Sequence, residues 1–510
     1  MVNKQIAQED DINSRVGIYD RVITKQPPPY YIFEYLDEKF LYDTSACRFF
    51  CIDDPMFHFL ELCRVYPIDR ARNIFQKEGL FSFEIAESVE NEVTILAKQG
   101  LFTVPNYSIS TEQMERQLEQ RYTAPWTKLE LALSETCNLA CKYCYCSTCR
   151  DMPNQGLMSE TVARQAITWL FAMSGKNKNV SITFFGGEPL LNKSTLRFAI
   201  EYSQRLAKLH GKKVFYSMTT NGTMLDDEVI RFIKRYNFGL MVSLDGPPEI
   251  HNRQCPTRDG QDSFDAAAAG IKRLMARRRS VTVRCTMTHP VPRMLDLIHF
   301  FEDFGFTRIV LGRTVNPVNP SSVDCTAEDF QEIDRQEREE IIPWALNKLA
   351  IGETPKYFPY AKEFNTEPNV SPFKCGACRG TTTVGADGCL YPCHRFVGMR
   401  AWQIGNISDG PNYEKCKQFW RDYRSAIAGN CESCWLWAQC KGPCPWEIAQ
   451  ADGTFSKPQY CDLIEKHTIR SAYVNHERQK LSAVIPTKVS HKSQFVNCDD
   501  KKNVTKTNNN

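Results

Sequence analysis

The chain has 510 residues, which suggests about three domains at roughly 150 residues each. It carries 63 lysine and arginine residues against 60 aspartate and glutamate residues, and this net charge of +3 argues against a protein that binds nucleic acid through a broad basic surface. No apolar run approaches the roughly 18 residues of a membrane span and the N-terminus lacks a signal peptide, so we expect a cytoplasmic protein with no DNA or membrane partner.

Residues 1–28 form a polar leader that ends in three prolines, and residues 29–105 are predicted to form a small domain of strands and helices. Strand-like runs lie at 30–36, 40–43, 48–52 and, as a last short strand, 101–104. Asp53 with Pro55 marks the first of three helices, which are expected from apolar residues at helical spacing. This order is compatible with a winged helix. A winged helix could bind DNA, but this region shows no strong basic stripe.

A linker at 106–125 precedes a region, 126–326, in which strands and helices alternate. Strands are expected at 128–134, 179–185, 214–219, 238–244, 281–286 and 307–315. Helices are expected at 159–174, 194–209, 226–236, 266–278 and 294–304. Six such units predict the α/β class with a parallel sheet, either open or curved into a partial (β/α)6 TIM-like barrel. The chemistry of such sheets lies at the C-terminal ends of the strands.

The chain then continues through a bridge at 327–373, a cysteine-rich domain at 374–470 and a tail at 471–510 that we expect to be disordered. The whole sequence has 22 cysteines, more than packing requires. Without a secretory signal, disulfides are a poor explanation because the cytosol keeps thiols reduced. Metal or iron–sulfur ligation is therefore the leading interpretation.

The first cysteine motif is CxxxCxxC, formed by Cys137, Cys141 and Cys144 directly after the first strand of the predicted barrel. Three thiolates on one tight loop can hold three irons of a four-iron cubane, which leaves the fourth iron without a protein ligand. An open coordination position is where a metal centre binds substrate. A zinc site or chance clustering remains an alternative, with Cys146 and Cys149 close by.

Motifs at the predicted strand ends resemble those of the radical S-adenosylmethionine (SAM) superfamily. They are CNLACKYCY, GGEPLLN at 186–192, TTNGTML at 219–225 and SLDGPPEIHNR at 243–253. The resemblance covers about residues 126–315. It implies that one electron from an iron–sulfur cluster splits SAM, and that the 5′-deoxyadenosyl radical so formed abstracts a hydrogen from the substrate. It also implies an external one-electron reductant of the flavodoxin or ferredoxin type.

The resemblance assigns roles by position. The cysteine triad Cys137, Cys141 and Cys144 would hold the 4Fe–4S cluster whose open iron chelates SAM. The other SAM-site residues would be Gly186, Gly187 and Glu188 for the amino group, Tyr143 for the adenine, Ser243 for the ribose, and Asn221 to shape the neighbouring loop. Turn or cap chemistry is the alternative for the last two.

One position departs from the superfamily. At the position that Cys255 occupies in this chain, relatives commonly carry an arginine, which can pair with the SAM carboxylate. Either Arg253 or Arg258 replaces it, or the carboxylate is held differently.

A second cysteine field, CX2CX5CX3C, resembles the SPASM extension over about 374–467. SPASM modules house two auxiliary 4Fe–4S clusters. By analogy, the first would be held by Cys375, Cys378, Cys393 and Cys444, and the second by Cys431, Cys434, Cys440 and Cys461. Cys389 competes with Cys375 for the first set, and a zinc ribbon is the alternative for the CX2C pair alone.

Residues 30–104 resemble the PqqD-like peptide-recognition domain of ribosomal-peptide (RiPP) maturases. Such a domain captures a leader sequence as an added strand, and tethering raises the effective concentration of the core peptide at the radical site. Because SPASM enzymes mostly act on peptides or proteins, the resemblance implies a maturase that cross-links a ribosomally made precursor peptide. We favour a thioether cross-link.

Other readings remain. A carbon–carbon or ether macrocycle is the alternative within the class. Sulfatase maturation is disfavoured because sulfatase-maturing enzymes carry Asp directly after the cysteine that corresponds to Cys393, where this chain has His394, and generally lack the N-terminal domain. Outside the class, an iron–sulfur redox sensor would not cleave SAM, and a zinc-stabilised scaffold would be colourless.

Overall fold

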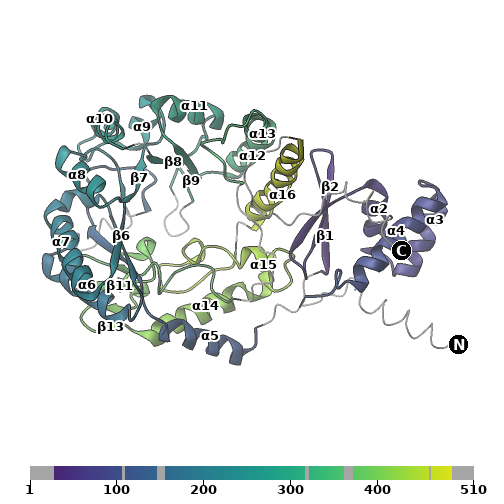
Figure 1. Cartoon of the computed structure of the whole chain (residues 1–510), viewed down its shortest axis with the longest axis horizontal. Helices are drawn as coiled ribbons and strands as arrows, with labels where there is room; N and C mark the ends of the chain where they lie inside the picture. The colour runs from purple at the N-terminus through teal and green to yellow at the C-terminus, as the bar shows by residue number, and fades with distance from the viewer. Residues whose placement is uncertain are drawn as a thin grey trace, which may run out of the picture.

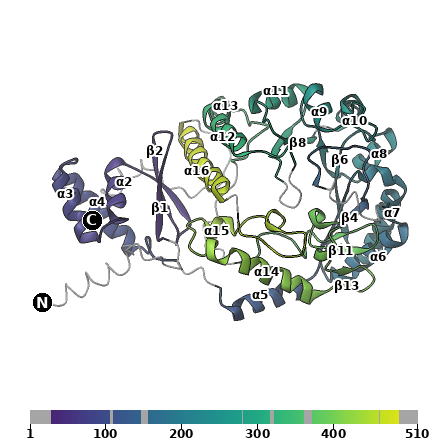
Figure 2. The same cartoon turned by 180° about the vertical axis from the view of Figure 1, so that it is seen from behind.

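The computed structural model describes residues 28–105, 109–145, 156–278, 280–315, 321–360, 371–458 and 461–484. Figures 1 and 2 show a ring of strands and helices at one end of the molecule and a small N-terminal unit at the other, with helix α16 between them. None of the described helices combines the length and the apolar character needed to cross a membrane. Cys146 and Cys149, the leader up to residue 27 and the tail from residue 485 lie outside the described residues.

The N-terminal unit is a three-stranded antiparallel sheet followed by three helices. The strands pair in the order β1-β2-β3. The helices begin where the sequence indicates, since the side chain of Asp53 accepts a hydrogen bond from the Met56 N–H and caps the first of them. The bounds are β1 (Tyr30–Tyr35), β2 (Glu38–Asp43), β3 (Arg48–Ile52), α2 (Asp54–Cys63), α3 (Ile68–Glu78) and α4 (Phe83–Lys98).

Both faces of this small sheet are buried. Ile32 and Leu41 point to one face and pack against the unit's own helices. Phe33 and Phe40 point to the other face. They pack against Trp435 and against Ala472 of helix α16 (Cys461–Val484). Successive side chains of a strand alternate between faces, so each strand serves both contacts. The N-terminal unit is thereby joined to the rest of the chain through an apolar interface.

The large sheet contains the six parallel strands that the sequence predicts, adjacent in chain order from β4 to β9. They are β4 (Lys128–Ser134), β5 (Asn179–Gly186), β6 (Lys213–Thr220), β7 (Gly239–Ser243), β8 (Thr282–Met287) and β9 (Arg308–Arg313). The predicted α/β class with a curved parallel sheet is confirmed.

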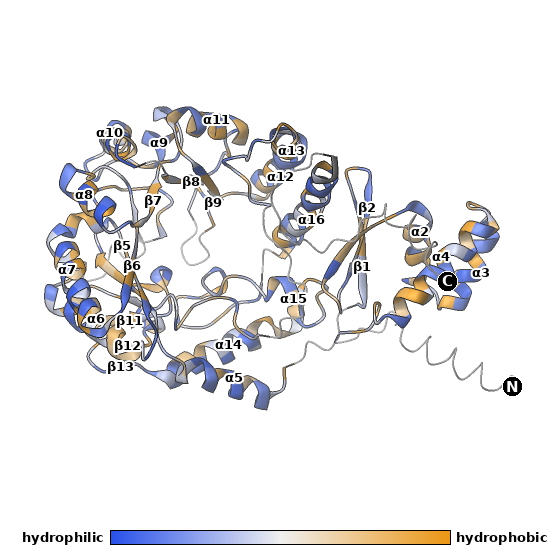
Figure 3. Cartoon of the chain, in the orientation of Figure 1, coloured by the Kyte–Doolittle hydropathy of each residue, from blue (hydrophilic) through white to orange (hydrophobic). Residues whose placement is uncertain are grey.

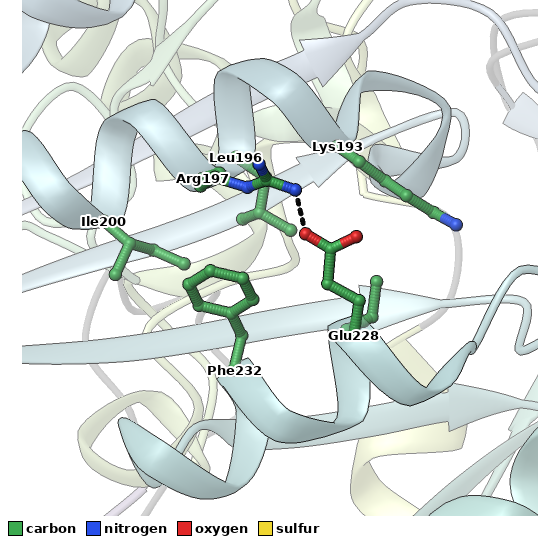
Figure 4. Close-up of a pocket in the computed structure, with 7 residues that line it drawn as sticks. Lys193, Leu196, Arg197, Ile200, Glu228 and Phe232 are labelled. Atoms are coloured by element: carbon green, nitrogen blue, oxygen red, sulfur yellow. Dashed lines mark hydrogen bonds and ion pairs between the residues drawn. The ribbon is translucent and has the colours of Figure 1, made fainter.

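Helices surround this sheet, and Figure 3 shows hydrophobic and hydrophilic residues alternating along them. They are α5 (Thr111–Thr123), α6 (Glu160–Met173), α7 (Lys193–His210), α8 (Asp227–Arg235), α9 (Pro248–Gln254), α10 (Phe264–Met275), α11 (Met294–Phe304), α12 (Ala327–Gln336) and α13 (Ile342–Ala350). A surface pocket between α7 and α8 is crossed by an ion pair between Arg197 and Glu228 (Figure 4). This pocket lies on the outer layer and contains none of the predicted site residues.

The cysteine-rich region extends the same sheet. Its strand β10 (Thr383–Val384) pairs in parallel with β4, and antiparallel pairs then add β11 (Cys389–Tyr391), β12 (Gly405–Asn406) and β13 (Gly410–Pro411). Helices α14 (Tyr413–Cys431) and α15 (Trp437–Cys440) follow. The cysteine field is therefore held next to β4, the strand that leads into the first cysteine motif.

Two sequence-based expectations are wrong. The short strand expected at 101–104 is turn and irregular backbone. The tail expected to be disordered from residue 471 is helical as far as Val484, because α16 buries Ala472 and Val474 completely. Arg470 also forms a 2.6 Å ion pair with the buried Glu337, which fixes the helix against the bridge segment.

Candidate active site

The three cysteines of the first motif lie on the loop that follows β4. The loop is held by main-chain hydrogen bonds from Ala140 N–H to the Pro256 carbonyl (2.7 Å) and from Lys142 N–H to the Gln254 carbonyl (2.9 Å). Cys137, Cys141 and Cys144 all line one cavity of about 170 Å³ that is open to solvent. The side chains that the sequence assigns to a cluster therefore face a common space at the C-terminal ends of the strands.

The spacing of the sulfur atoms does not suit a single metal ion. A zinc ion with bonds of roughly 2.3 Å brings its sulfur ligands to about 3.8 Å from one another. Among the described residues, only two groups of three candidate ligand atoms lie within 4.8 Å of one another, and neither is the cysteine triad of the first motif. The wider spacing fits a polynuclear cluster, which the thiolates of Cys137, Cys141 and Cys144 would hold.

The two glycines after β5 let the strand-end loop sit against the cysteine loop. A Cβ at Gly186 would lie 2.1 Å from the Ser134 carbonyl oxygen, and one at Gly187 would lie 2.3 Å from the Thr136 carbonyl oxygen and 3.1 Å from the Cys137 Cβ. Both glycines also line the cavity. The sequence argument attributed these glycines to a close approach of SAM, whereas the structure shows that the cysteine loop itself requires them.

Glu188 is fully buried and is not among the residues that line the cavity. Its Oε1 accepts hydrogen bonds from the Leu190 N–H (3.0 Å) and the Thr220 hydroxyl (2.8 Å), and its Oε2 accepts one from the Asn221 N–H (2.8 Å). Burial raises the pKa of this carboxyl to about 7 against these donors. Glu188 therefore ties the loops after β5 and β6 together.

Tyr143 lies between the cysteines and is fixed by a buried acid. Its hydroxyl donates to Asp245 Oδ2 (2.6 Å), and the same oxygen accepts from the Cys255 thiol at 3.2 Å. The Thr286 N–H donates to Asp245 Oδ1 (2.9 Å) and keeps the carboxylate in place. Burial and the charge of Asp245 raise the pKa of Tyr143, so its hydroxyl stays protonated. The ring of Tyr143 is thus presented to the cavity in a fixed position.

Asn221 and Ser243 both line the cavity. The Asn221 side chain donates to Asn138 Oδ1 (2.9 Å) and accepts from the Thr223 N–H (3.1 Å), so it joins the loop after β6 to the cysteine loop. Ser243 ends β7 at the cavity wall. These positions agree with the predicted places of the two residues, while their contacts to SAM stay predictions.

Sequence reasoning missed two acidic residues of the site. Asp245, inside the SLDG motif, is not among the residues that line the cavity but fixes Tyr143, and this role was not foreseen. Glu135 lines the cavity, and burial raises the pKa of its carboxyl to about 6. Of the two arginines considered as replacements at Cys255, both are exposed, but only Arg258 is among the residues that line the cavity.

The second cysteine field forms two groups. Burial raises the pKa of Cys393 to about 12, and the neighbouring thiols of Cys444 and Cys375 add to the shift. Cys378 is buried beside Cys416 and is also close enough to Cys393 to feel its charge. For Cys389, burial and then Asp387 raise the pKa to about 11, and no thiol is among the main causes. The mutual influence of Cys375, Cys393 and Cys444 supports Cys375 over Cys389 in this group, while its role as a ligand stays a prediction.

The other group contains Cys431, Cys434, Cys440 and Cys461. Burial raises the pKa of Cys431 to about 12, and the three other thiols raise it further. Cys434 behaves in the same way, with its pKa raised to about 12 by burial and then by Cys440 and Cys461. The two sets of four predicted from the sequence are thus close in space, while their ligation of clusters stays a prediction.

Comparisons with known proteins agree with this site. Residues 131–309 match the family model described as the radical SAM superfamily. The cysteine-type anaerobic sulfatase-maturating enzyme of Clostridium perfringens is 25% identical over 346 residues, which cover 63% of this chain and 89% of that protein. The radical SAM cyclopropyl synthase TigE of Paramaledivibacter caminithermalis is 23% identical over 371 residues, which cover 69% of this chain and 75% of that protein.

A solved structure, native anSMEcpe with bound AdoMet, has the same fold. It superposes with a TM-score of 0.58 at 20% sequence identity and covers 71% of this chain and 100% of that chain. Enzymes of the radical SAM superfamily use a 4Fe–4S cluster and SAM as cofactors. The cysteine triad, the glycine-lined cavity and the family match agree on one conclusion: the chain carries a radical SAM domain at residues 131–309 and is a radical SAM enzyme.

Proposed function

We propose that this enzyme is a peptide maturase that forms a cross-link, with a thioether favoured, in a ribosomally made precursor peptide. The observation that carries the proposal is the position of the N-terminal sheet beside the second cysteine field. Tyr31 of β1 stacks on Trp435 with ring centroids 4.0 Å apart. A cavity of about 280 Å³ lies where the N-terminal unit meets the second cysteine field and is lined by Tyr30, Arg64 and Cys434 among others.

An outer strand of this sheet can pair with an extended peptide. β1 and β3 are the outer strands of the order β1-β2-β3, so each has one edge that no described strand covers. A leader peptide added as a further strand gains main-chain hydrogen bonds, and side-chain pockets supply specificity. The cavity at β1 lies directly on the path between this sheet and the cysteine-rich region. The arrangement supports capture of a leader whose core peptide extends toward the radical site.

The cluster with SAM supplies the radical that abstracts one hydrogen from the peptide. Forming a thioether also removes the proton of the substrate thiol and one further electron, which an auxiliary cluster held by the second cysteine field would accept. His394 is suited to receive the proton. Its Nδ1 is 3.1 Å from Glu130 Oε2, which leaves Nε2 as the basic nitrogen when Nδ1 carries the hydrogen. The His394 ring lies 4.3 Å from the ring of Phe185, a residue of the SAM cavity wall.

The test of this function is co-expression with a short peptide encoded beside this gene, followed by mass spectrometry. The expected product has lost two hydrogens, and its cysteine no longer reacts with a thiol reagent. A peptide of unchanged mass, obtained from cells in which the enzyme cleaves SAM, contradicts cross-linking.

Sulfatase maturation is the second candidate, and the likeness to the C. perfringens enzyme favours it. His394 argues against it, because the position after Cys393 carries no acid in this chain. A cysteine-containing sulfatase peptide distinguishes the two. Formation of formylglycine in that peptide supports the second candidate, and an unmodified peptide supports the first.

Arg258 is expected to bind the carboxylate of SAM in place of the missing arginine at Cys255. It lines the cavity, and its main-chain N–H donates to the Asn138 carbonyl of the cysteine loop (3.3 Å), which positions the residue without using the guanidinium. A hydrogen bond to a charged group contributes about 1.5–3 kcal/mol, so Arg258→Ala should weaken SAM binding by about tenfold or more. Isothermal titration of the reconstituted protein measures this. The control is Arg253→Ala, which removes an exposed arginine from the same segment and should leave the SAM affinity unchanged.

A further inference from the structure

We propose that Glu38, Cys51 and His476 form a binding site for a zinc-like divalent cation that fastens the N-terminal sheet to helix α16. These residues come from β2, β3 and α16, and none of them belongs to the cysteine sets described above. The proposal does not depend on the nature of the substrate. It assigns a metal to the interface between the two parts of the molecule that Figures 1 and 2 show side by side.

The three side chains meet because of the strand register. Cys51 pairs with Phe40, and Glu38 precedes Phe40 by two residues, so all three point to the face of the sheet that packs on α16. One ligand atom from each of Glu38, Cys51 and His476 lies within 4.8 Å of the other two. The Cys51 thiol donates a hydrogen bond to Glu38 Oε2 at 3.4 Å, and a bound metal ion would take the place of this proton and leave a thiolate. Such distances suit ligands that share a single ion of this size.

His476 supplies the strongest sign that a ligand is needed. Its side chain is buried, with 9% of its surface exposed, and its Nε2 is a buried atom with no hydrogen-bond partner within the part of the chain that the structure describes. A buried polar atom without a partner costs about 1–3 kcal/mol, so such atoms call for an explanation. The ring is held edge-on against Phe40, with centroids 5.6 Å apart at 90°. Its orientation is therefore fixed before any ion arrives.

The donor types and the local charge also suit a divalent cation. Thiolate, imidazole and carboxylate are the ligands of zinc, and three protein ligands with water as the fourth form an open tetrahedral site. Lys480 binds Glu38 Oε1 at 2.5 Å and Glu477 at 2.8 Å, which leaves Glu38 Oε2 facing Cys51. The Cys51 thiolate and the two carboxylates carry three negative charges. A divalent cation with Lys480 balances them.

A metal at this position would set how firmly the N-terminal sheet is held. Side-chain packing and the Lys480–Glu38 ion pair join this end of the sheet to α16. Local unfolding of α16 would break the bonds to a coordinated ion. The ion therefore stabilises the folded helix against such unfolding. Zinc is therefore expected to slow backbone hydrogen exchange in α16 and in β2 and β3, while exchange in the barrel helices α7 and α8 stays the same.

The test uses the full chain with its clusters reconstituted, dialysed against Zn²⁺ alone. We expect about one zinc per chain by elemental analysis, and zinc K-edge absorption with one sulfur and about three nitrogen or oxygen ligands. Cys51→Ser with His476→Gln should lose this zinc and the slowed exchange while keeping the iron content. The control, Cys63→Ala with His58→Gln, changes a cysteine and a histidine of the same unit and should keep the zinc.

Three results would overturn the proposal. In the first, the wild-type protein binds no zinc under these conditions. In the second, the Cys51/His476 variant keeps the zinc at an unchanged iron content. In the third, the absorption spectrum reports three or four sulfur ligands, which would place the zinc on cysteines of the iron–sulfur sets instead.

Discussion

Cys141→Ala is expected to abolish SAM cleavage while leaving the protein folded. Cys141 is the middle residue of the triad, on the loop fixed by Ala140 and Lys142 to residues 254–256. Those contacts are made by the main chain, so replacing the side chain leaves them intact. Two thiolates remain at a centre built for three, and the cluster that accepts the electron is lost or inactive. No 5′-deoxyadenosine should form with dithionite and SAM under anaerobic conditions.

The control for this variant is Cys63→Ala. Cys63 is also a cysteine in the interior, but it lies in the core of the N-terminal unit. Its replacement should preserve the rate of 5′-deoxyadenosine formation, with a modest loss of stability from the smaller side chain. Circular dichroism and gel filtration of both variants establish that each is folded. If Cys141→Ala still cleaved SAM at the wild-type rate, the assignment of the catalytic centre to this loop would be wrong.

The sequence predicted the barrel well because local signals were strong. β4 was expected at 128–134 and is found there, and α11 was expected at 294–304 and is found there. Apolar runs flanked by turn residues define such strands without help from the rest of the fold. The cysteine triad was predicted for a similar reason, since three ligands within eight residues necessarily lie on one loop.

The parts that failed depend on contacts between distant segments. The helical rhythm weakens after residue 470, yet α16 continues because Ala472 lies under the N-terminal sheet and Arg470 pairs with Glu337. Asp245 resembles an ordinary turn residue in the sequence. Only the fold brings the Tyr143 hydroxyl to it. Propensity and spacing carry no information on such pairs, because the partners are about a hundred residues or more apart.

Replacement of Cys375 and Cys444 together by alanine is expected to separate SAM cleavage, which should continue, from peptide cross-linking, which should stop. Both thiols belong to the group around Cys393, and neither is among the residues that line the SAM cavity. The variant should lose one auxiliary cluster, so that its iron content falls from about twelve to about eight per chain. SAM cleavage should persist, because the triad is intact. Peptide cross-linking should fall below detection, because the electron released on bond formation has lost its acceptor.

Cys389→Ala is the matched control for this double variant, since it removes a cysteine of the same region whose neighbours are Asp387 and Asn406. It should retain about twelve irons and full cross-linking activity. The reverse outcome, iron loss in Cys389→Ala with a normal iron content in the double variant, would exchange the roles of Cys389 and Cys375 in the first auxiliary set.

A double variant that loses four irons but still cross-links the peptide would show that this cluster is not on the electron path. The residual electron would then have to leave through the set around Cys434, whose position beside Trp435 and the N-terminal sheet puts it nearer to the expected path of the leader.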